Sequence, residues 1–172
     1  CQLSFTVPAT QMFDDYLYVS STNQTFKDHF SNMADRFIQE FSLNQESFVL
    51  DIGSNDGVFL SPLKENGIKI LGVDPAENLV NLANSNGLET LHGYFDDKIT
   101  DEIIASKGRA DIVTAFNVFA HADDLKSITK NVFKLLKNSG IFIIEVQYLL
   151  DTIKDLTFDN IYHEHVNYWS VN

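Results

Sequence analysis

The sequence predicts an α/β protein built on a Rossmann-like parallel sheet with helices on both faces, preceded by a helical N-terminal arm. From about residue 48 onward, short apolar runs alternate with segments whose apolar residues recur at helical spacing. The runs are apolar at nearly every position, which is typical of strands buried on both faces of a parallel sheet. Asn-Gly or Gly follows several helical segments and ends them before the next strand begins.

Each expected strand is a run of apolar and β-branched residues bounded by turn signals. The first run leads into a glycine-bearing turn, and the second ends in Gly72-Val73-Asp74. The third is short, and the fourth and fifth are continuous apolar segments. We therefore expect strands at residues 48–52, 68–73, 88–91, 110–116 and 141–146.

The expected helices fill the intervals between these strands. Pro75 stands where a first helical position would lie, a position that proline suits because it lacks the N–H group left unpaired there. Asp123 is expected to cap the last helix, whose apolar residues keep helical spacing until Gly140. The expected helices lie at residues 58–65, 75–86, 98–106 and 123–140.

An amphipathic helix is expected ahead of the sheet, at residues 24–41. Its apolar side chains recur every three or four residues, at Phe26, Phe30, Met33, Phe37 and Phe41. Such a stripe is more often core than ligand site, so we expect it to pack on the sheet domain. The preceding residues 13–21 are rich in tyrosine and acid without a clear period, and we expect them to form a lid or arm. The chain is thus expected to divide into an arm and helix (1–45), an α/β core (46–150) and a tail (151–172).

Composition limits the possible partners. The 172 residues carry a net charge of −12, and their only arginines are Arg36 and Arg109. Nucleic acids and anionic membranes both require a basic footprint, so neither is an expected partner. No apolar run approaches the roughly 18 residues of a membrane span and no signal-peptide pattern is present, so we expect a cytoplasmic protein. The single cysteine, Cys1, rules out an internal disulfide and a multi-cysteine zinc site within this sequence.

The turn after the first expected strand indicates a nucleoside-containing cofactor. A dinucleotide site needs closely spaced glycines that bring a helix N-terminus to a pyrophosphate. This turn has only Gly53 and Gly57, and it carries the carboxylates of Asp51 and Asp56. Carboxylates suit S-adenosylmethionine (SAM), which lacks phosphate and carries an ammonium and a sulfonium group. Asp74, at the end of the second strand, is expected to bind the ribose.

Further polar side chains follow the later strands. Asn117 and His121 come directly after the fourth strand, at the carboxyl edge where open α/β folds bind their ligands. Phe95 follows the third strand and is expected near the adenine. His163 and His165 stand two residues apart in the tail, but spacing places no third ligand beside them, so we expect no metal site.

The chain resembles the sugar C-methyltransferase family, which methylates a carbon beside the ketone of nucleotide-linked 4-keto deoxysugars. Five blocks in the family's order carry the resemblance and span nearly the whole chain. The tyrosine-rich first block and the histidine-rich last block are the specific ones, since the glycine turn alone indicates only a SAM enzyme. The blocks are FDDYLYVSS at residues 13–21, LDIGSNDG at 50–57, NVFAH at 117–121, EVQY at 145–148 and FDNIYHEH at 158–165.

The resemblance implies a class I SAM-methyltransferase sheet, with SAM as cofactor and S-adenosylhomocysteine as product. It also implies two groups of site residues. Those matching the family's acceptor site are Tyr16, Asn117, His121, Tyr162, Glu164 and His165. Those expected at the cofactor are Asp51, Gly53, Ser54, Asn55, Gly57, Asp74, Phe95 and Asn117.

The implied chemistry needs a general base, because a carbon beside a ketone becomes nucleophilic only after it loses a proton. His165 is the expected base, since a neutral imidazole titrates near the working pH. Tyr16 and Tyr162 are expected to donate to the enolate oxygen or to relay the proton. Glu164 is expected to orient a partner or to raise the pKa of a base.

The chain also departs from the family's pattern. The N-terminal zinc module, of which Cys1 would be a remnant, a second α/β domain and the sixth and seventh strands are all expected to be missing. A nucleotide diphosphate needs basic contacts, and the five blocks contain no Lys or Arg. Two alternatives therefore stay open: a methyltransferase for another small O or N acceptor, and a truncated SAM-binding module without activity.

Overall fold

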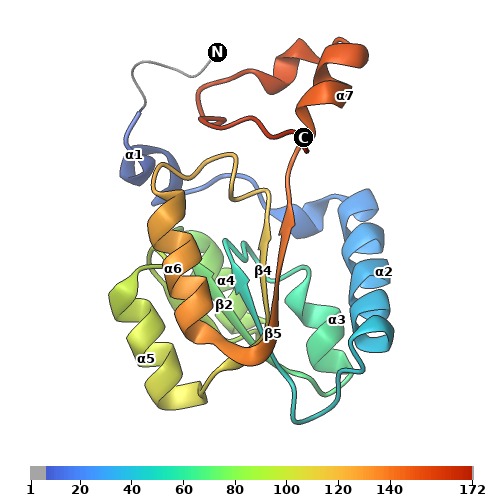
Figure 1. Ribbon diagram of the computed structural model, residues 1–172, viewed down its shortest axis with the longest axis vertical. Helices are drawn as coiled ribbons and strands as arrows, with labels where there is room; N and C mark the ends of the chain where they lie inside the picture. Colours follow the sequence, from blue (N-terminus) through green and yellow to red (C-terminus); the bar gives the residue numbers. More distant parts are fainter. Residues whose placement is uncertain (1–6, 172) are drawn as a thin grey trace.

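A computed structural model describes residues 7–171; Cys1 lies outside the described residues. Its centre is a five-stranded, fully parallel sheet with strand order β3-β2-β1-β4-β5 (Figure 1). The predicted fold class is thereby confirmed. The strands are β1 (Phe48–Ile52), β2 (Lys69–Asp74), β3 (Thr90–His92), β4 (Ala110–Phe116) and β5 (Leu136–Glu145).

Helices precede, connect and follow the strands. The connecting helices lie where the sequence predicts them, with ends that differ by a few residues. The helices are α1 (Ala9–Phe13), α2 (Gln24–Glu40), α3 (Leu60–Glu65), α4 (Glu77–Ser85), α5 (Asp97–Lys107), α6 (Leu125–Leu135) and α7 (Leu149–Lys154), with 3-10 turns η1 (Ser20–Thr22) and η2 (Phe158–Asn160). No helix within residues 7–171 is long and apolar enough to cross a membrane.

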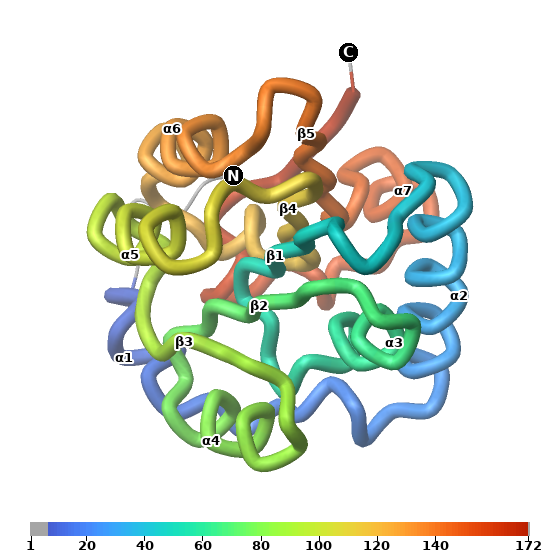
Figure 2. The backbone as a smooth tube through the Cα atoms, turned by 90° about the horizontal axis from the view of Figure 1, so that it is seen from below, coloured from blue at the N-terminus to red at the C-terminus, as the bar shows by residue number. Residues whose placement is uncertain are grey.

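The central strands β1 and β4 are buried on both faces, as their apolar sequences predict, whereas the edge strand β5 is half-buried or exposed along its length. All five residues of β1 are buried. Val49 joins a hydrophobic cluster with α2 and α3, whereas Leu50 joins a second cluster with α5 and α6. Alternate side chains of one strand therefore supply both cores, and Figure 2 shows these helix pairs on opposite sides of the sheet.

The aromatic stripe of α2 packs on the sheet domain, which confirms the structural interpretation of it. Phe30 and Phe37 are buried, and both rings contact Phe59 edge-on. Phe59 in turn packs against Phe116 of β4, with ring centroids 4.8 Å apart. Asn23 caps the helix by accepting hydrogen bonds from the backbone at its start.

The last connecting helix differs from its expected bounds at both ends. The cap is Asp124 rather than Asp123, since the Asp124 side chain accepts a hydrogen bond from Ser127 N at 3.0 Å. The helix ends at Leu135 rather than near Gly140, because Leu136 already pairs with Ala110 of β4. Leu136 still fits the helical spacing of α6, so the spacing of apolar residues does not mark where the strand begins.

The tail folds back over the carboxyl edge of the sheet. Leu149 N donates to Trp169 O at 2.7 Å, and the backbone N–H groups of Val166 and Asn167 donate to Ala120 O. These bonds hold the last expected block beside the loop after β4. The N-terminal helix α1 lies at the same end of the molecule (Figure 1). Helix α1 and the tail thus both lie above the carboxyl ends of the strands.

Candidate active site

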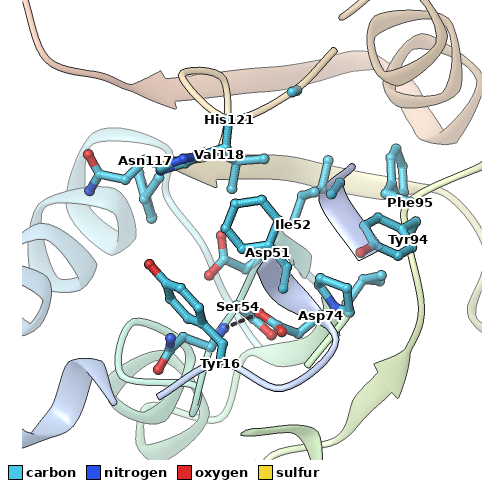
Figure 3. Close-up of a pocket in the computed structure, with 18 of the residues that line it drawn as sticks. Tyr16, Asp51, Ile52, Ser54, Asp74, Tyr94, Phe95, Asn117, Val118 and His121 are labelled. Atoms are coloured by element: carbon cyan, nitrogen blue, oxygen red, sulfur yellow. Dashed lines mark hydrogen bonds between the residues drawn. The ribbon is translucent and has the colours of Figure 1, made fainter. Parts of the chain in front are cut away.

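A cavity of about 600 Å³ opens at the carboxyl ends of β1, β2 and β4. That volume lies within the range of small-molecule and cofactor sites. The N-terminal arm, the loop after β3 and the C-terminal tail complete its walls. Figure 3 shows Asp51 and Asp74 in its interior, with Asn117 and the Tyr94–Phe95 pair on different sides. The lining includes no Lys or Arg among the residues that the structure describes.

Asp51 is the most deeply buried acid of the cavity, with 4% of its surface exposed. Thr114 of the neighbouring strand donates its hydroxyl hydrogen to Asp51 Oδ1 at 2.6 Å. Burial raises the pKa of this carboxyl to about 7, the Thr114 hydrogen bond opposes the rise, and the nearby Asp74 charge adds to it. Asp51 is therefore a site where a cation would be stabilised.

Asp74 is held by the backbone around it. Its Oδ2 accepts from Asn55 N at 2.8 Å and its Oδ1 accepts from Ala76 N at 2.8 Å. Burial raises the Asp74 pKa, and these two hydrogen bonds oppose the rise. Each carboxylate oxygen has a second lone pair, so the side chain retains acceptor capacity toward a ligand hydroxyl.

The structure excludes a side chain at the two glycines of the turn on different grounds. Gly53 has φ of +66°, and a Cβ there would lie 2.5 Å from Val118 Cγ2. Gly53 lines the cavity together with Ser54 and Asn55. Gly57, with φ of +81°, does not line it, and a Cβ there would meet Leu88. Gly57 thus serves packing beneath the turn, while Gly53 shapes the cavity wall.

The N-terminal arm is tied to the cofactor loops by polar contacts. Asn78 of α4 accepts a hydrogen bond from Tyr16 N at its Oδ1, at 3.3 Å, and donates one from its Nδ2 to Tyr16 O, at 2.9 Å. Asn55 Nδ2 donates to Tyr18 O at 2.9 Å, and Asn55 Oδ1 accepts from Ser20 N at 3.0 Å. The arm therefore lies against the cavity and contributes Phe13, Tyr16, Tyr18 and Ser20 to its wall.

Tyr94, which the sequence analysis did not single out, joins the arm to the loop after β3. Its hydroxyl donates to Asp14 Oδ1 at 2.9 Å, and it lines the cavity beside Phe95. Burial and the neighbouring Asp14 carboxylate raise the Tyr94 pKa, so the hydroxyl stays protonated. Its position two residues after β3 is the signal that could have identified it.

Two histidines meet on the tail side of the cavity. The ring centroids of His121 and His165 are 4.9 Å apart, and the ring of Tyr162 lies 4.3 Å from His165. His165 Nδ1 contacts Asn160 O and His121 Nδ1 contacts Glu164 O, both at 2.8 Å. A carbonyl oxygen only accepts hydrogen bonds, so each Nδ1 carries the hydrogen. In the neutral imidazoles, each Nε2 therefore has a free lone pair.

The pKa values of the two tyrosines and of His121 in this cluster are shifted by their surroundings. Tyr16 donates its hydroxyl hydrogen to Glu164 Oε2 at 3.2 Å. Burial and the Glu164 charge raise the pKa of Tyr16, and the same two causes raise that of Tyr162. Burial lowers the His121 pKa against the opposing hydrogen bond to Glu164. At neutral pH the tyrosines are therefore hydrogen-bond donors, and His121 is neutral.

The structure brings together nearly all of the predicted site residues. Gly57 and Glu164 are the two that do not line the cavity; Glu164 acts at its edge through Tyr16 and His121. Asn117 lines it together with Gln147, which the sequence analysis did not select. Further lining residues outside the predicted set include Phe13, Tyr18, Ser20, Pro75, Tyr94, Val118, Asp123 and Asp124.

The chain matches a family model described as "Methyltransferase domain" over residues 26–172. It is 34% identical over 160 residues to the C-methyltransferase NovU of Streptomyces niveus, a match that covers 93% of this chain and 38% of NovU. It is 32% identical over 97 residues to a ubiquinone biosynthesis O-methyltransferase of Bradyrhizobium diazoefficiens, covering 56% of this chain and 38% of that protein. The chain thus spans about two fifths of the length of these relatives.

Solved structures share the fold. A SAM-dependent methyltransferase from Archaeoglobus fulgidus superposes with a TM-score of 0.64 at 20% identity, over 85% of this chain and 63% of that one. DesVI from Streptomyces venezuelae superposes with a TM-score of 0.59 at 16% identity, over 76% of this chain and 55% of that one. Because the family model matches most of the sequence, the chain belongs to the methyltransferase domain family.

Proposed function

We propose that this chain is the SAM-binding core of a C-methyltransferase that alkylates the carbon beside the ketone of a nucleotide-linked deoxysugar. The observation that carries the proposal is the group of His165, His121 and Tyr162 beside an acidic cofactor cavity. It offers base nitrogens and phenolic donors within one cavity. Enolate formation needs both kinds of group.

The residues of the cavity fit SAM. Asp51 offers a carboxylate to a cationic ligand, and Asp74 offers acceptor lone pairs to ribose hydroxyls. The lining contains no Lys or Arg among the described residues, which disfavours a cofactor with phosphate groups. Phe95 and Tyr94 supply an aromatic wall for the adenine. When bound, SAM supplies an electrophilic methyl group and leaves as S-adenosylhomocysteine.

The remaining residues account for the proton and the oxygen of the reaction. His165 Nε2 removes a proton from the carbon beside the ketone and leaves the electron pair in the enolate, while the Nδ1–H group of His165 stays hydrogen-bonded to Asn160 O. Tyr162 donates its hydroxyl hydrogen to the ketone oxygen as negative charge develops there. Tyr16 is already committed to Glu164, so its role is to hold that carboxylate and the tail in place.

Two comparisons favour carbon over oxygen as the acceptor atom. The match to NovU covers 93% of the chain, whereas the matches to ubiquinone O-methyltransferases cover between 54% and 70%. The arm and the tail supply Tyr16, Tyr162 and His165 to the cavity. The C-methyltransferase match thus extends over more of the chain than these O-methyltransferase matches do.

The nucleotide of the acceptor is expected to lie outside the cavity. A diphosphate requires basic or backbone N–H partners, and the cavity instead presents Asp51, Asp74, Asp123 and Asp124. Only the keto sugar enters beside the histidines. Phosphate contacts would then come from other surfaces or from parts of a longer protein.

Incubation of the chain with methyl-¹³C-SAM and a panel of acceptors tests this function. The panel contains nucleotide-linked 4-keto deoxysugars, a catechol for oxygen transfer and a primary amine for nitrogen transfer. We expect the label on a carbon of the keto sugar. Label on the catechol or the amine alone would contradict the proposal.

A further inference from the structure

Gln147 lies two residues beyond the end of β5 and contacts Asn117, which follows β4. Gln147 Nε2 donates to Asn117 Oδ1 at 3.1 Å. The backbones of the two segments are paired up to this point, because Phe116 is in register with Glu145 and Asn117 N donates to Glu145 O at 2.8 Å. The side-chain contact therefore joins two positions that the sheet fixes relative to each other.

The backbone of Asn117 is in the left-handed region, with φ of +56°. Residues other than glycine rarely adopt this conformation, and asparagine tolerates it best. Asn117 lines the cavity together with His121 and Gln147. Strain of this kind is concentrated at functional sites, because it persists only where the surrounding structure imposes it.

The direction of the Gln147–Asn117 hydrogen bond decides what Asn117 presents to the cavity. An amide side chain has an acceptor at one end and two donors at the other. With Oδ1 occupied by Gln147, the Nδ2 donors are left for a ligand, and within residues 7–171 they have no protein acceptor. Beside the hydroxyl of Tyr162, the Asn117 amide is thus a further donor that the cavity offers to a ketone oxygen.

The arrangement leaves one polar atom of Gln147 unsatisfied, which is energetically unfavourable. Its Oε1 is buried and has no hydrogen-bond partner in the part of the chain that the structure describes. An unpaired buried amide oxygen is unfavourable compared with an apolar side chain of similar size. Packing alone would favour such an apolar replacement, so the Nε2 contact to Asn117 is the feature that an amide supplies at this position.

We propose that Gln147 is a positioning residue that orients the Asn117 amide with its Nδ2 donors toward the acceptor oxygen. This inference rests on the proposed function for the identity of that oxygen. It assigns Asn117 the second hydrogen bond to the developing enolate, beside that of Tyr162. In this role Gln147 acts through Asn117.

The substitution Gln147→Glu tests the direction of the bond. A carboxylate at this position cannot donate to Asn117 Oδ1, and it accepts from Asn117 Nδ2 instead, so the amide turns over and presents its oxygen. The kcat for the keto sugar is expected to fall about 10²-fold, the usual effect of losing one oxyanion donor, with little change in KM or in SAM affinity. Gln147→Met, which neither donates nor adds charge, is expected to give a smaller loss. The control is Gln45→Glu, which adds the same charge at an exposed residue far from the cavity.

A second measurement is independent of turnover. The side-chain amide protons of Asn117, assigned by NMR through their absence in Asn117→Ser, report their hydrogen bonding directly. One of them is expected to move downfield in Gln147→Glu, where it bonds to a carboxylate, and to stay in place in Gln45→Glu. Unchanged Asn117 amide signals in both Gln147 variants, or an unchanged kcat in Gln147→Glu, would overturn the inference. Absence of any methyl transfer by the unsubstituted chain would instead contradict the proposed function, while the amide signals would still decide the role of Gln147.

Discussion

Tyr16 and Glu164 lie 148 positions apart in the sequence and are joined by a hydrogen bond of 3.2 Å between the Tyr16 hydroxyl and Glu164 Oε2. This bond links the N-terminal arm to the C-terminal tail above the cofactor cavity. The Glu164 backbone carbonyl also holds His121. The two ends of the chain are thereby coupled to the proposed acceptor site.

A double-mutant cycle measures this coupling. Tyr16→Phe and Glu164→Ala are each expected to lower the free energy of unfolding, and the double variant is expected to be less destabilised than their sum by about 0.5–1.5 kcal/mol. Denaturant unfolding gives the four values. Tyr18→Phe, whose hydroxyl makes no hydrogen bond among the described residues, serves as the control and is expected to show no coupling with Glu164→Ala. Additive effects of the Tyr16 and Glu164 changes would remove the bond from the account.

Asp51 is expected to make the ligand-free protein less stable as the pH rises. Its folded-state pKa is raised to about 7 from an ordinary value of 3.8, so the folded state binds more protons than the unfolded state between these values. Stability present below pH 4 is therefore lost as the pH rises toward 7. Asp51→Asn should exceed the original chain in unfolding free energy by roughly 1–3 kcal/mol at pH 8, with no difference near pH 3.

The exposed Asp97, paired with Lys130 at 3.2 Å, provides the matched control for that pH dependence. Asp97→Asn removes a surface ion pair and is expected to change stability by less than about 1 kcal/mol. Chemical unfolding at several pH values gives the comparison. A pH dependence that Asp51→Asn leaves intact would show that this carboxyl does not titrate as described.

Asp74 is expected to carry much of the affinity for SAM through its remaining lone pairs. Asp74→Ala should weaken binding by roughly 1.5–3 kcal/mol, the range for hydrogen bonds to a charged group. Asp56→Ala removes a carboxylate of the turn after β1 that does not line the cavity, and it should bind SAM almost normally. Titration calorimetry measures both. Equal affinities in the two variants would exclude Asp74 from the site, and binding of NAD in place of SAM would overturn the choice of cofactor.

Gly53 is constrained both by its positive φ and by its close approach to Val118, and a set of substitutions separates the two effects. Gly53→Ala meets both a φ of +66° and a clash with Val118, whereas Gly108→Ala meets a φ of +84° with no atom within 4 Å. Thermal unfolding should show a larger loss for Gly53→Ala, by about 1–3 kcal/mol. Adding Val118→Ala to Gly53→Ala should recover part of this difference. Equal losses at the two glycines would mean that the clash with Val118 is relieved without cost.

The elements that sequence predicted best are those whose signals are local. Continuous apolar runs identified the strands, and polar residues just beyond β2 and β4 identified Asp74 and Asn117 as cavity residues. The start of β5 at Leu136 was missed because Leu136 continues the helical spacing of α6 and the next four residues are not apolar, so only pairing with Ala110 marks the strand. Gln147 and Tyr94 were missed for a related reason: their partners Asn117 and Asp14 are remote in the sequence.

The exchange of hydrogens beside the ketone tests the proposed mechanism most directly. A 4-keto deoxysugar nucleotide is incubated in D₂O with S-adenosylhomocysteine and the original chain, the His165→Ala variant or the control His163→Ala, whose exposed side chain lies outside the cavity. NMR follows deuterium at the carbon beside the ketone, and calorimetry confirms that each variant still binds the cofactor product. We predict exchange with the original chain and with His163→Ala, and a rate about 10²- to 10⁴-fold lower with His165→Ala. Exchange at the original rate in His165→Ala would contradict the central claim that His165 is the base.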